Sequence, residues 1–264
     1  MGSETPFSQA NFIKRLVGLP KEDLWIVDGN IYTKPLGSDR WRIARKTLQP
    51  KAQMATWQPV YHSRYIRLDD DQWRAPWIGE PAEQWSIARK RRYEFEGDGA
   101  GTLRFDFGMA LADYELKYPY NQFSPMDETE PIEDVMVGAS FLPEREGLSV
   151  ALSSTAVLDD QTARPWTLTA RIEADGRGSL QASEAVSGQI RELATGQVTS
   201  PVPGKAIQVA MWYVDQEMSL WVNGSKTLVW SFDLEMDVIL ARLHMPTYPS
   251  INIKVSGSPV QMSD

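Results

Sequence analysis

A lysine set among apolar residues near the start of the chain is the residue best suited to do chemistry. Lys14 lies in the run 12–17, which reads Phe-Ile-Lys-Arg-Leu-Val. A lysine is a poor base at neutral pH because its ordinary pKa is roughly 10.4, but burial among apolar groups lowers that pKa. A neutral amine can then take the proton of a serine hydroxyl as the oxygen attacks a carbonyl. The alternative interpretation is that Lys14 and Arg15 form a solvated basic pair on a strand edge.

The residues around Lys14 resemble a conserved box of bacterial type I signal peptidases. The stretch Asn11–Pro20 ends in Gly-Leu-Pro and continues into an acidic, strand-like run, Glu22–Tyr32. The resemblance implies that Lys14 is the general base of a Ser/Lys endopeptidase that removes signal peptides from exported preproteins. It implies a structural ion-pairing role for Arg15, and a location at the extracytoplasmic face of the cell membrane. The chain departs from the family pattern at Lys21, where the family usually has glycine.

The nucleophile of such a peptidase is missing from the expected place. The family's Ser-x-Ser-Met-x-Pro-Thr type of box normally precedes the lysine, and the thirteen residues before Lys14 do not contain it. Fragments of the box occur at 124–126, 244–247 and 256–259, but none has the full order of residues, and serine and proline are common in turns. The family's last box, Gly-Asp-Asn…Ser-x-Asp-Ser-Arg, is also missing. We therefore interpret residues 1–47 as a fragment of a peptidase core that is inactive by itself.

Composition excludes several classes of function. A net charge of −8 over 264 residues argues against nucleic-acid binding, which needs a basic face. The chain has no cysteine and two histidines, so disulfides and thiolate metal sites are excluded, and we expect no metal and no cofactor. No apolar run approaches the roughly 18 residues of a membrane-spanning helix. The N-terminus lacks a charged region followed by an apolar one, so we expect no signal peptide there. The chain taken alone is expected to be soluble.

Strand patterns dominate the sequence. Apolar residues alternate with polar ones at 103–107, 135–141, 148–152, 166–172, 207–213, 218–222 and 228–232, which is the period of half-buried strands. Asp28-Gly29 and Asn223-Gly224 lie between such runs and predict two-residue hairpins. We expect Met218, Leu220 and Val222 to be buried. Helices are predicted only at 50–57 and 81–91, where a proline occupies the first turn.

The second half of the chain resembles a concanavalin A-like or laminin-G-like sandwich in its strand, acidic turn and Asn-Gly pattern at 214–224. Arg45-Lys46, followed by Pro59-Val60-Tyr61, resembles the start of a long insertion found in planctomycete-type signal peptidases. The predicted fold is all-β. It consists of a concanavalin-like β-sandwich (jelly roll) at 48–264, preceded by a short β-rich piece of a peptidase core at 1–47. The alternative function is a non-catalytic sandwich that binds a glycan or a protein, with Lys14 vestigial.

A short acidic stretch also resembles part of a carbohydrate-active sandwich. Glu235 and Asp237 resemble the first part of the Glu-x-Asp-x-x-Glu strand of concanavalin-like glycoside hydrolases, but Leu240 occupies the position of the third carboxylate. On a strand the first two carboxylates would share one face. Without hydrolysis, exposed tryptophans could still stack on a ligand. The candidates are Trp73, Trp77, Trp85 and Trp221, with packing in the core as the alternative for each.

Two charge clusters complete the candidates. Asp69-Asp70-Asp71 could supply oxygen ligands to calcium, although no glycine-spaced loop surrounds it and solvation is the alternative. Arg89-Lys90-Arg91-Arg92 is a basic run that would favour the C-terminal end of a helix. Neither cluster changes the expectation of a ligand-binding or peptidase-related β protein.

Overall fold

The computed structural model describes residues 19–27, 30–46, 50–57, 59–65, 75–87, 91–106, 134–158, 165–184, 187–242 and 250–263. Lys14, with all of residues 1–18, lies outside this part. The chain divides into two compact units, Met1–Ala44 and Arg45–Asp264, and each is described by itself.

The smaller unit contains a three-stranded antiparallel sheet in the order β1-β2-β3. Its strands are β1 (Glu22–Val27), β2 (Asn30–Pro35) and β3 (Arg42–Ile43). Val27 pairs with Asn30, so the two strands predicted around Asp28-Gly29 are confirmed. The sheet buries Val27, Tyr32 and Ile43. Its origin in a peptidase core, and the boundary at residue 47, stay predictions.

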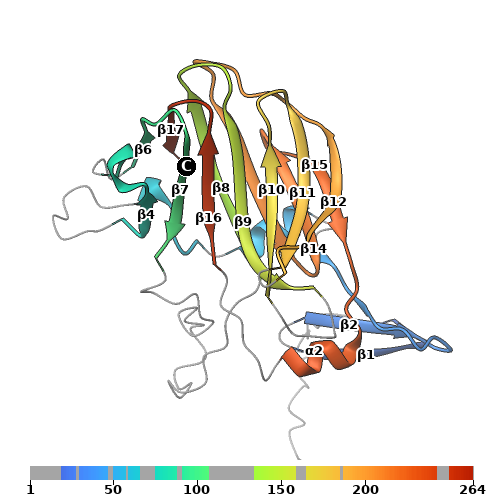
Figure 1. Ribbon diagram of the computed structural model, residues 1–264. Coiled ribbons are helices and arrows are strands. Elements are labelled where there is room, and N and C mark those ends of the chain that lie inside the picture. Colours follow the sequence, from blue (N-terminus) through green and yellow to red (C-terminus); the bar gives the residue numbers. More distant parts are fainter. Residues whose placement is uncertain are drawn as a thin grey trace, which may run out of the picture. The chain divides into compact units, whose positions relative to one another are not determined.

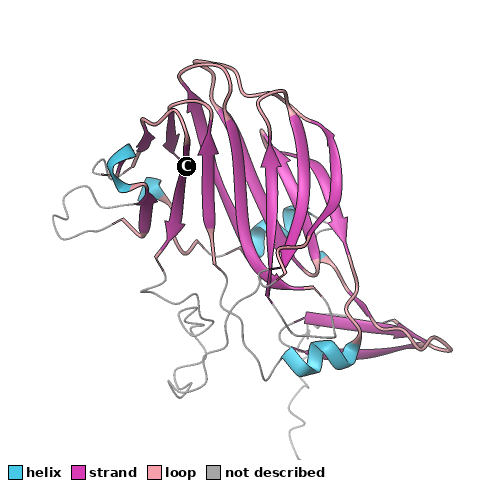
Figure 2. Cartoon of the chain, viewed as in Figure 1, coloured by secondary structure: helices cyan, strands magenta, loops and turns pink. Residues whose placement is uncertain are grey.

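The larger unit contains two seven-stranded sheets, and Figure 2 shows how far strands outnumber helices in the described chain. Sheet 1 has the order β12-β11-β10-β9-β16-β7-β4, and sheet 2 has the order β15-β14-β13-β8-β17-β6-β5. Sheet 1 contains β4 (Trp77–Glu80), β7 (Ala100–Phe105), β9 (Ser149–Val157), β10 (Pro165–Ile172), β11 (Arg177–Glu184), β12 (Ile190–Gln197) and β16 (Asn252–Ser256). Sheet 2 contains β5 (Trp85–Ser86), β6 (Tyr93–Phe95), β8 (Val135–Pro143), β13 (Ile207–Val214), β14 (Glu217–Val222), β15 (Ser225–Ser231) and β17 (Val260–Ser263).

One hydrophobic core joins the two sheets, which lie face to face in Figure 1. Each strand contributes alternate residues to it, such as Leu168 and Ile172 from β10 and Val209 and Met211 from β13. All pairs of neighbouring strands are antiparallel in the described residues. The predicted all-β, concanavalin-like sandwich is therefore confirmed.

The hairpin predicted at Asn223-Gly224 is also confirmed. Strands β14 and β15 flank the two turn residues, which have φ values of 49° and 77°. Met218, Leu220 and Val222 are buried in the core, as expected. Asparagine and glycine tolerate positive φ, which most other residues avoid, and this explains why the pair marks the turn.

Of the two predicted helices, one is confirmed and one is wrong. Helix α1 covers Pro50–Thr56. Of the second predicted helix, the described residues 81–87 instead form a single 3-10 turn, Ala82–Gln84, and then the short strand β5. The reason is tertiary packing, because Trp85 is buried with its ring centroid 5.1 Å from that of Phe95 and β5 pairs with β6. A second 3-10 turn covers Ser63–Tyr65.

The carboxylates Glu235 and Asp237 do not lie on a strand. Helix α2 covers Met236–Arg242, so the hydrolase-like strand considered above is wrong. Leu234, Val238 and Ile239 are buried at a helical spacing, which favours the helix over a strand. Glu235 precedes the helix and Asp237 lies in its first turn, so the strand geometry that would place both carboxylates on one face is not formed.

Candidate functional site

The outer face of sheet 2, on the side away from the core, carries a group of aromatic and charged side chains from β13, β14 and β15. In β13 the core takes Val209, Met211 and Tyr213, so the alternation of a strand places Trp212 on the outer face. In β14 the core takes Met218, Leu220 and Val222, which places Glu217, Ser219 and Trp221 outside. The register pairs Trp212 with Ser219 and Trp221 with Ala210, so these residues are close neighbours.

Three tryptophans form a continuous aromatic row on this face. The rings of Trp212 and Trp221 are stacked, with centroids 4.2 Å apart and planes inclined by 25°. Trp57, directly after α1, meets Trp212 edge-on at 5.8 Å between centroids. The indole nitrogen of Trp221 donates a hydrogen bond of 2.9 Å to Ser219 Oγ. Trp221 is half-buried, and its ring is thus held in one orientation at the surface.

An ion pair lies beside the row. The ammonium of Lys226 is 2.8 Å from Oε1 of Glu217 and 5.6 Å from the centroid of Trp221. The side chain of Glu217 is almost fully buried, whereas that of Lys226 is partly exposed. The two charges neutralise each other, and a cation above a surface ring contributes only about 0.5–1 kcal/mol.

Apolar side chains are exposed around the row, in addition to the Glu217–Lys226 pair. Across from Trp212 lies Met136 of β8, and across from Ala210 lies Gly138. Met136 and Val229 are about half exposed, at 49% and 48%, although both are apolar. The side chain of Gln208 is exposed one step further along β13. Exposed apolar side chains next to a fixed tryptophan are typical of a binding surface.

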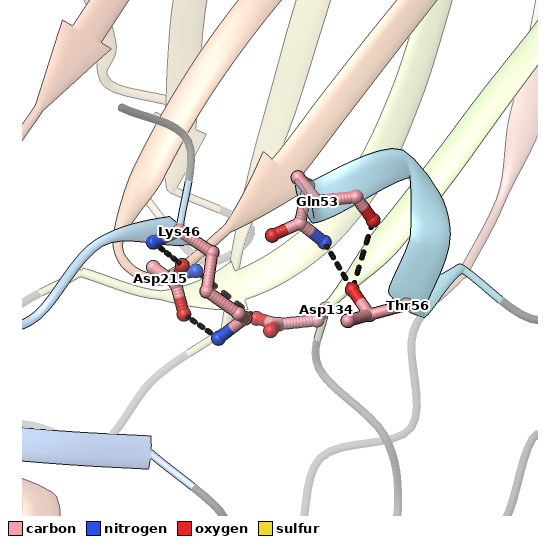
Figure 3. A network of polar contacts seen from close by, with 5 residues as sticks. All are labelled: Lys46, Gln53, Thr56, Asp134 and Asp215. Carbon is pink, nitrogen blue, oxygen red and sulfur yellow. Dashed lines mark hydrogen bonds and ion pairs between the residues drawn. The ribbon is translucent and has the colours of Figure 1, made fainter. Parts of the chain in front are cut away.

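A polar network lies at the β13–β14 turn (Figure 3). The carboxylate of Asp215, fully buried, accepts from the Lys46 ammonium at 2.5 Å and from the Lys46 backbone N–H at 2.6 Å. The backbone N–H of Asp215 donates to Asp134 Oδ1 at 3.3 Å. Beside it on α1, Gln53 Nε2 donates to Thr56 Oγ1 at 3.3 Å, and this hydroxyl donates to the Gln53 carbonyl.

The network stabilises an unusual turn. Asp215 and Gln216 have positive φ values of 51° and 57°, a conformation that costs about 1–3 kcal/mol for residues held away from their usual regions. Gln216 is fixed as well, because its Oε1 accepts from the Leu234 N–H at 2.8 Å. Arg45 binds Asp233 at 2.7 Å and also donates to the Phe232 carbonyl. The charged groups of this cluster thus have structural partners.

The same facts argue against hydrolysis at this face. Both oxygens of Asp215 are occupied by Lys46, and Glu217 is occupied by Lys226. A retaining glycosidase needs two carboxyl groups about 5–5.5 Å apart, one as nucleophile and one as acid, and both must reach substrate. Among the described residues, no group of three or more His, Cys, Asp or Glu side chains could hold a metal ion.

The structure places the residues predicted from the sequence as follows. Several of them lie outside the described residues, namely Lys14, Asp69–Asp71, Trp73, Arg89-Lys90, Ser124 and His244. Ser256 ends β16, and Ser258 lies in the turn that follows. Ser258 is buried, accepts from the Arg145 N–H at 3.1 Å and donates to the Pro259 carbonyl at 2.8 Å. That serine is structural. Arg91 and Arg92 are exposed.

Of the described tryptophans predicted to stack on a ligand, Trp221 alone keeps a position suited to it. Trp85 is buried against Phe95, and Trp77 is half-buried with its ring centroid 5.1 Å from that of Phe105. Both therefore pack in or beside the core. The sequence interpretation missed Trp212 and Trp57. The alternation in β13 was the available signal, because residues predicted to face the core leave Trp212 on the opposite face.

Comparison with known proteins yields structural likeness only. No protein-family model matches the chain, and no curated protein matches it. Among solved structures, the carbohydrate-binding module CBM66 from Bacillus subtilis aligns with a TM-score of 0.39 and 8% identity, over 68% of this chain and 88% of that one. The Bacillus licheniformis β-glucanase aligns with a TM-score of 0.39 and 8% identity, over 69% of this chain and 79% of that one. Sheep galectin-11 aligns with a TM-score of 0.32 and 12% identity, over 51% of this chain and 89% of that one.

At these TM-scores the likeness carries no argument about function. The comparisons give no support to the resemblance to signal peptidases, nor to a protease. No helix in the described part of the chain is long and apolar enough to cross a membrane.

Proposed function

We propose that the larger unit is a non-catalytic β-sandwich that binds a neutral glycan on the outer face of sheet 2. The observation that carries the proposal is the half-buried ring of Trp221, stacked on Trp212 and hydrogen-bonded to Ser219. A rigid indole at a surface offers an apolar area on which the C–H face of a sugar ring can pack. The conformational entropy cost is small because the ring is already fixed.

The charges support a neutral ligand. Lys226 and Glu217 form a pair with each other, so neither is left to bind a charged group. The whole chain carries a net charge of −8, which disfavours polyanions. The exposed Gln208 and the neighbouring polar strand ends offer hydrogen bonds of the kind that hydroxyl groups use. Binding rather than cleavage is favoured because the nearby carboxylates are occupied by lysines.

The test is affinity electrophoresis of the purified chain against a panel of neutral polysaccharides (cellulose derivatives, β-1,3-glucan, xylan, mannan and fructan), followed by calorimetry on the best ligand. Trp221→Ala should weaken binding at least tenfold, which is about 1.4 kcal/mol. The matched control is Trp25→Ala, which removes an exposed tryptophan from the smaller unit and should leave binding unchanged. Retention of full affinity by Trp221→Ala would exclude this face as the site.

A peptidase-related role stays a second proposal, supported only by the box around Lys14. A lysine base needs a hydroxyl within roughly 2.6–3.2 Å, and no sequence box places a serine beside Lys14. We expect the chain alone not to cleave a signal-peptide substrate. Its membrane location and its preprotein substrate belong to the same proposal.

A further inference from the structure

Helix α1 and Trp57, together called the α1 cover (Pro50–Trp57), lie on the outer face of sheet 2 with little apolar surface buried. Among the α1 side chains that the structure describes, Gln53 alone is buried, at 2% exposed, and Met54 is 62% exposed. The ring of Trp57 supplies the contact with Trp212. A helix of seven residues is marginal by itself in water. Among the described side chains of the cover, Trp57 makes the ring contact with sheet 2 and Gln53 is the buried member of α1.

Two buried polar atoms of the cover have no hydrogen-bond partner among the described residues. They are Oε1 of Gln53, an acceptor, and Nε1 of Trp57, a donor. Figure 3 shows the amide of Gln53 turned toward Thr56 through its nitrogen. The amide oxygen has no partner among the described residues. Burial of an unpaired polar atom is unfavourable. Both atoms would gain hydrogen bonds to water if the cover left the sheet.

The cover hides the aromatic surface next to Trp221. Trp212 is 4% exposed, with one face stacked on Trp221 and Trp57 against its ring. Departure of Trp57 would expose ring surface of Trp212 that continues the surface of Trp221. We propose that the α1 cover opens while the sandwich stays folded, and that Trp212 beneath it is a second stacking surface for the ligand. The opening stands by itself, whereas the role of Trp212 in binding rests on the proposed function.

The proposal has a thermodynamic consequence. A ligand that touches Trp212 binds only the open state, so its affinity is reduced by the fraction of molecules that are open. Binding must then shift the population toward the open state. A variant that favours the closed state should weaken binding, and one that favours the open state should strengthen it.

Two variants change the cover in opposite directions. Gln53→Leu replaces the buried amide with an apolar side chain of similar size, which removes an unpaired atom and favours the closed state. Trp57→Ala removes the ring contact and favours the open state. Lys51→Leu is the matched control for the first variant, because it makes a similar change at an exposed position of the same helix.

The first measurement needs no ligand. Hydrogen exchange of the α1 amides and oxidative footprinting of Trp212 are followed by mass spectrometry. In the wild type the α1 amides should exchange at least about tenfold faster than those of β13. Gln53→Leu should slow, and Trp57→Ala should speed, both α1 exchange and Trp212 oxidation. Trp166, in the core and 1% exposed, is the internal control for the folded sandwich.

Equal protection of α1 and β13 would overturn the proposal, as would rates that neither variant changes. The second measurement adds the best polysaccharide from the panel. It should speed α1 exchange, and Gln53→Leu should bind more weakly than Lys51→Leu. If α1 opens but the ligand protects it, the opening is correct and the role of Trp212 is wrong. If the wild type binds no polysaccharide of the panel, both the proposed function and the role of Trp212 in binding are refuted. The exchange data would still show whether the α1 cover opens.

Discussion

Replacing Lys46 should destabilise the protein more than replacing Asp215, although the two residues form one ion pair. The Asp215 carboxylate is fully buried, while the Lys46 side chain is 38% exposed. Lys46→Met leaves a buried carboxylate that keeps the hydrogen bond of 2.6 Å from the backbone N–H of residue 46 but loses the ammonium. Breaking a buried pair in this way costs about 3–5 kcal/mol, and the partial exposure of Lys46 brings our expectation to about 2–3 kcal/mol.

Asp215→Asn should cost less, about 1 kcal/mol. The amide can still accept from the backbone N–H, asparagine tolerates the positive φ of 51°, and the lysine that loses its partner can turn to water. The double variant should be close to Asp215→Asn alone, because no buried charge is left. Coupling of this size is expected between residues in direct contact.

The assay is urea unfolding followed by far-ultraviolet circular dichroism. With a slope of about 3 kcal/mol per molar urea, Lys46→Met should lower the midpoint by about 0.7–1 M, and Asp215→Asn by about 0.3 M. Lys205→Met, at an exposed position of the same unit, should stay within about 0.2 M. The reasoning is refuted if Asp215→Asn loses as much stability as Lys46→Met, since the charge would then not be the cause.

Three shorter predictions use other parts of the chain. Gly257→Ala should destabilise more than Gly224→Ala in the same urea assay, because both glycines have positive φ but only a Cβ at 257 would overlap the carbonyl oxygen of Gly147. Leu168→Ala in the core should cost about 2–5 kcal/mol, seen as a lower melting temperature. Lys14→Ala and the wild type should both fail to cleave a signal-peptide substrate, and turnover dependent on Lys14 would show that a nucleophile was missed.

Alternation and turn chemistry made much of the sandwich predictable. The period-2 runs at 135–141, 166–172 and 207–213 became β8, β10 and β13, and Asn223-Gly224 marked a hairpin. These signals are local and depend on one face of each strand being buried. The helix predicted from residue 81 is wrong over the described residues 81–87, because Trp85 packs beside Phe95 in a strand and tertiary packing overrides a weak helix propensity.

The site was less predictable, since it depends on which strands become neighbours. Trp221 was a candidate by type alone, and only the β13–β14 register shows that Trp212 stacks on it. The buried pair of Lys46 and Asp215 joins residues far apart in the sequence, and no local sequence pattern predicts it. The turn at Asp215-Gln216 lacks glycine, so residue type alone does not predict its positive φ values.

The central claim is that Trp221 on the outer face of sheet 2 contacts a neutral glycan. The direct test is a titration of the ¹⁵N-labelled chain with the best polysaccharide fragment, following the indole N–H signals, with Trp221→Phe used to assign the signal. We predict that the Trp221 signal shifts most, because its indole N–H lies at this surface bonded to Ser219. Shifts confined to Trp25 and Trp41 of the smaller unit, or no shift with any fragment, would contradict the account.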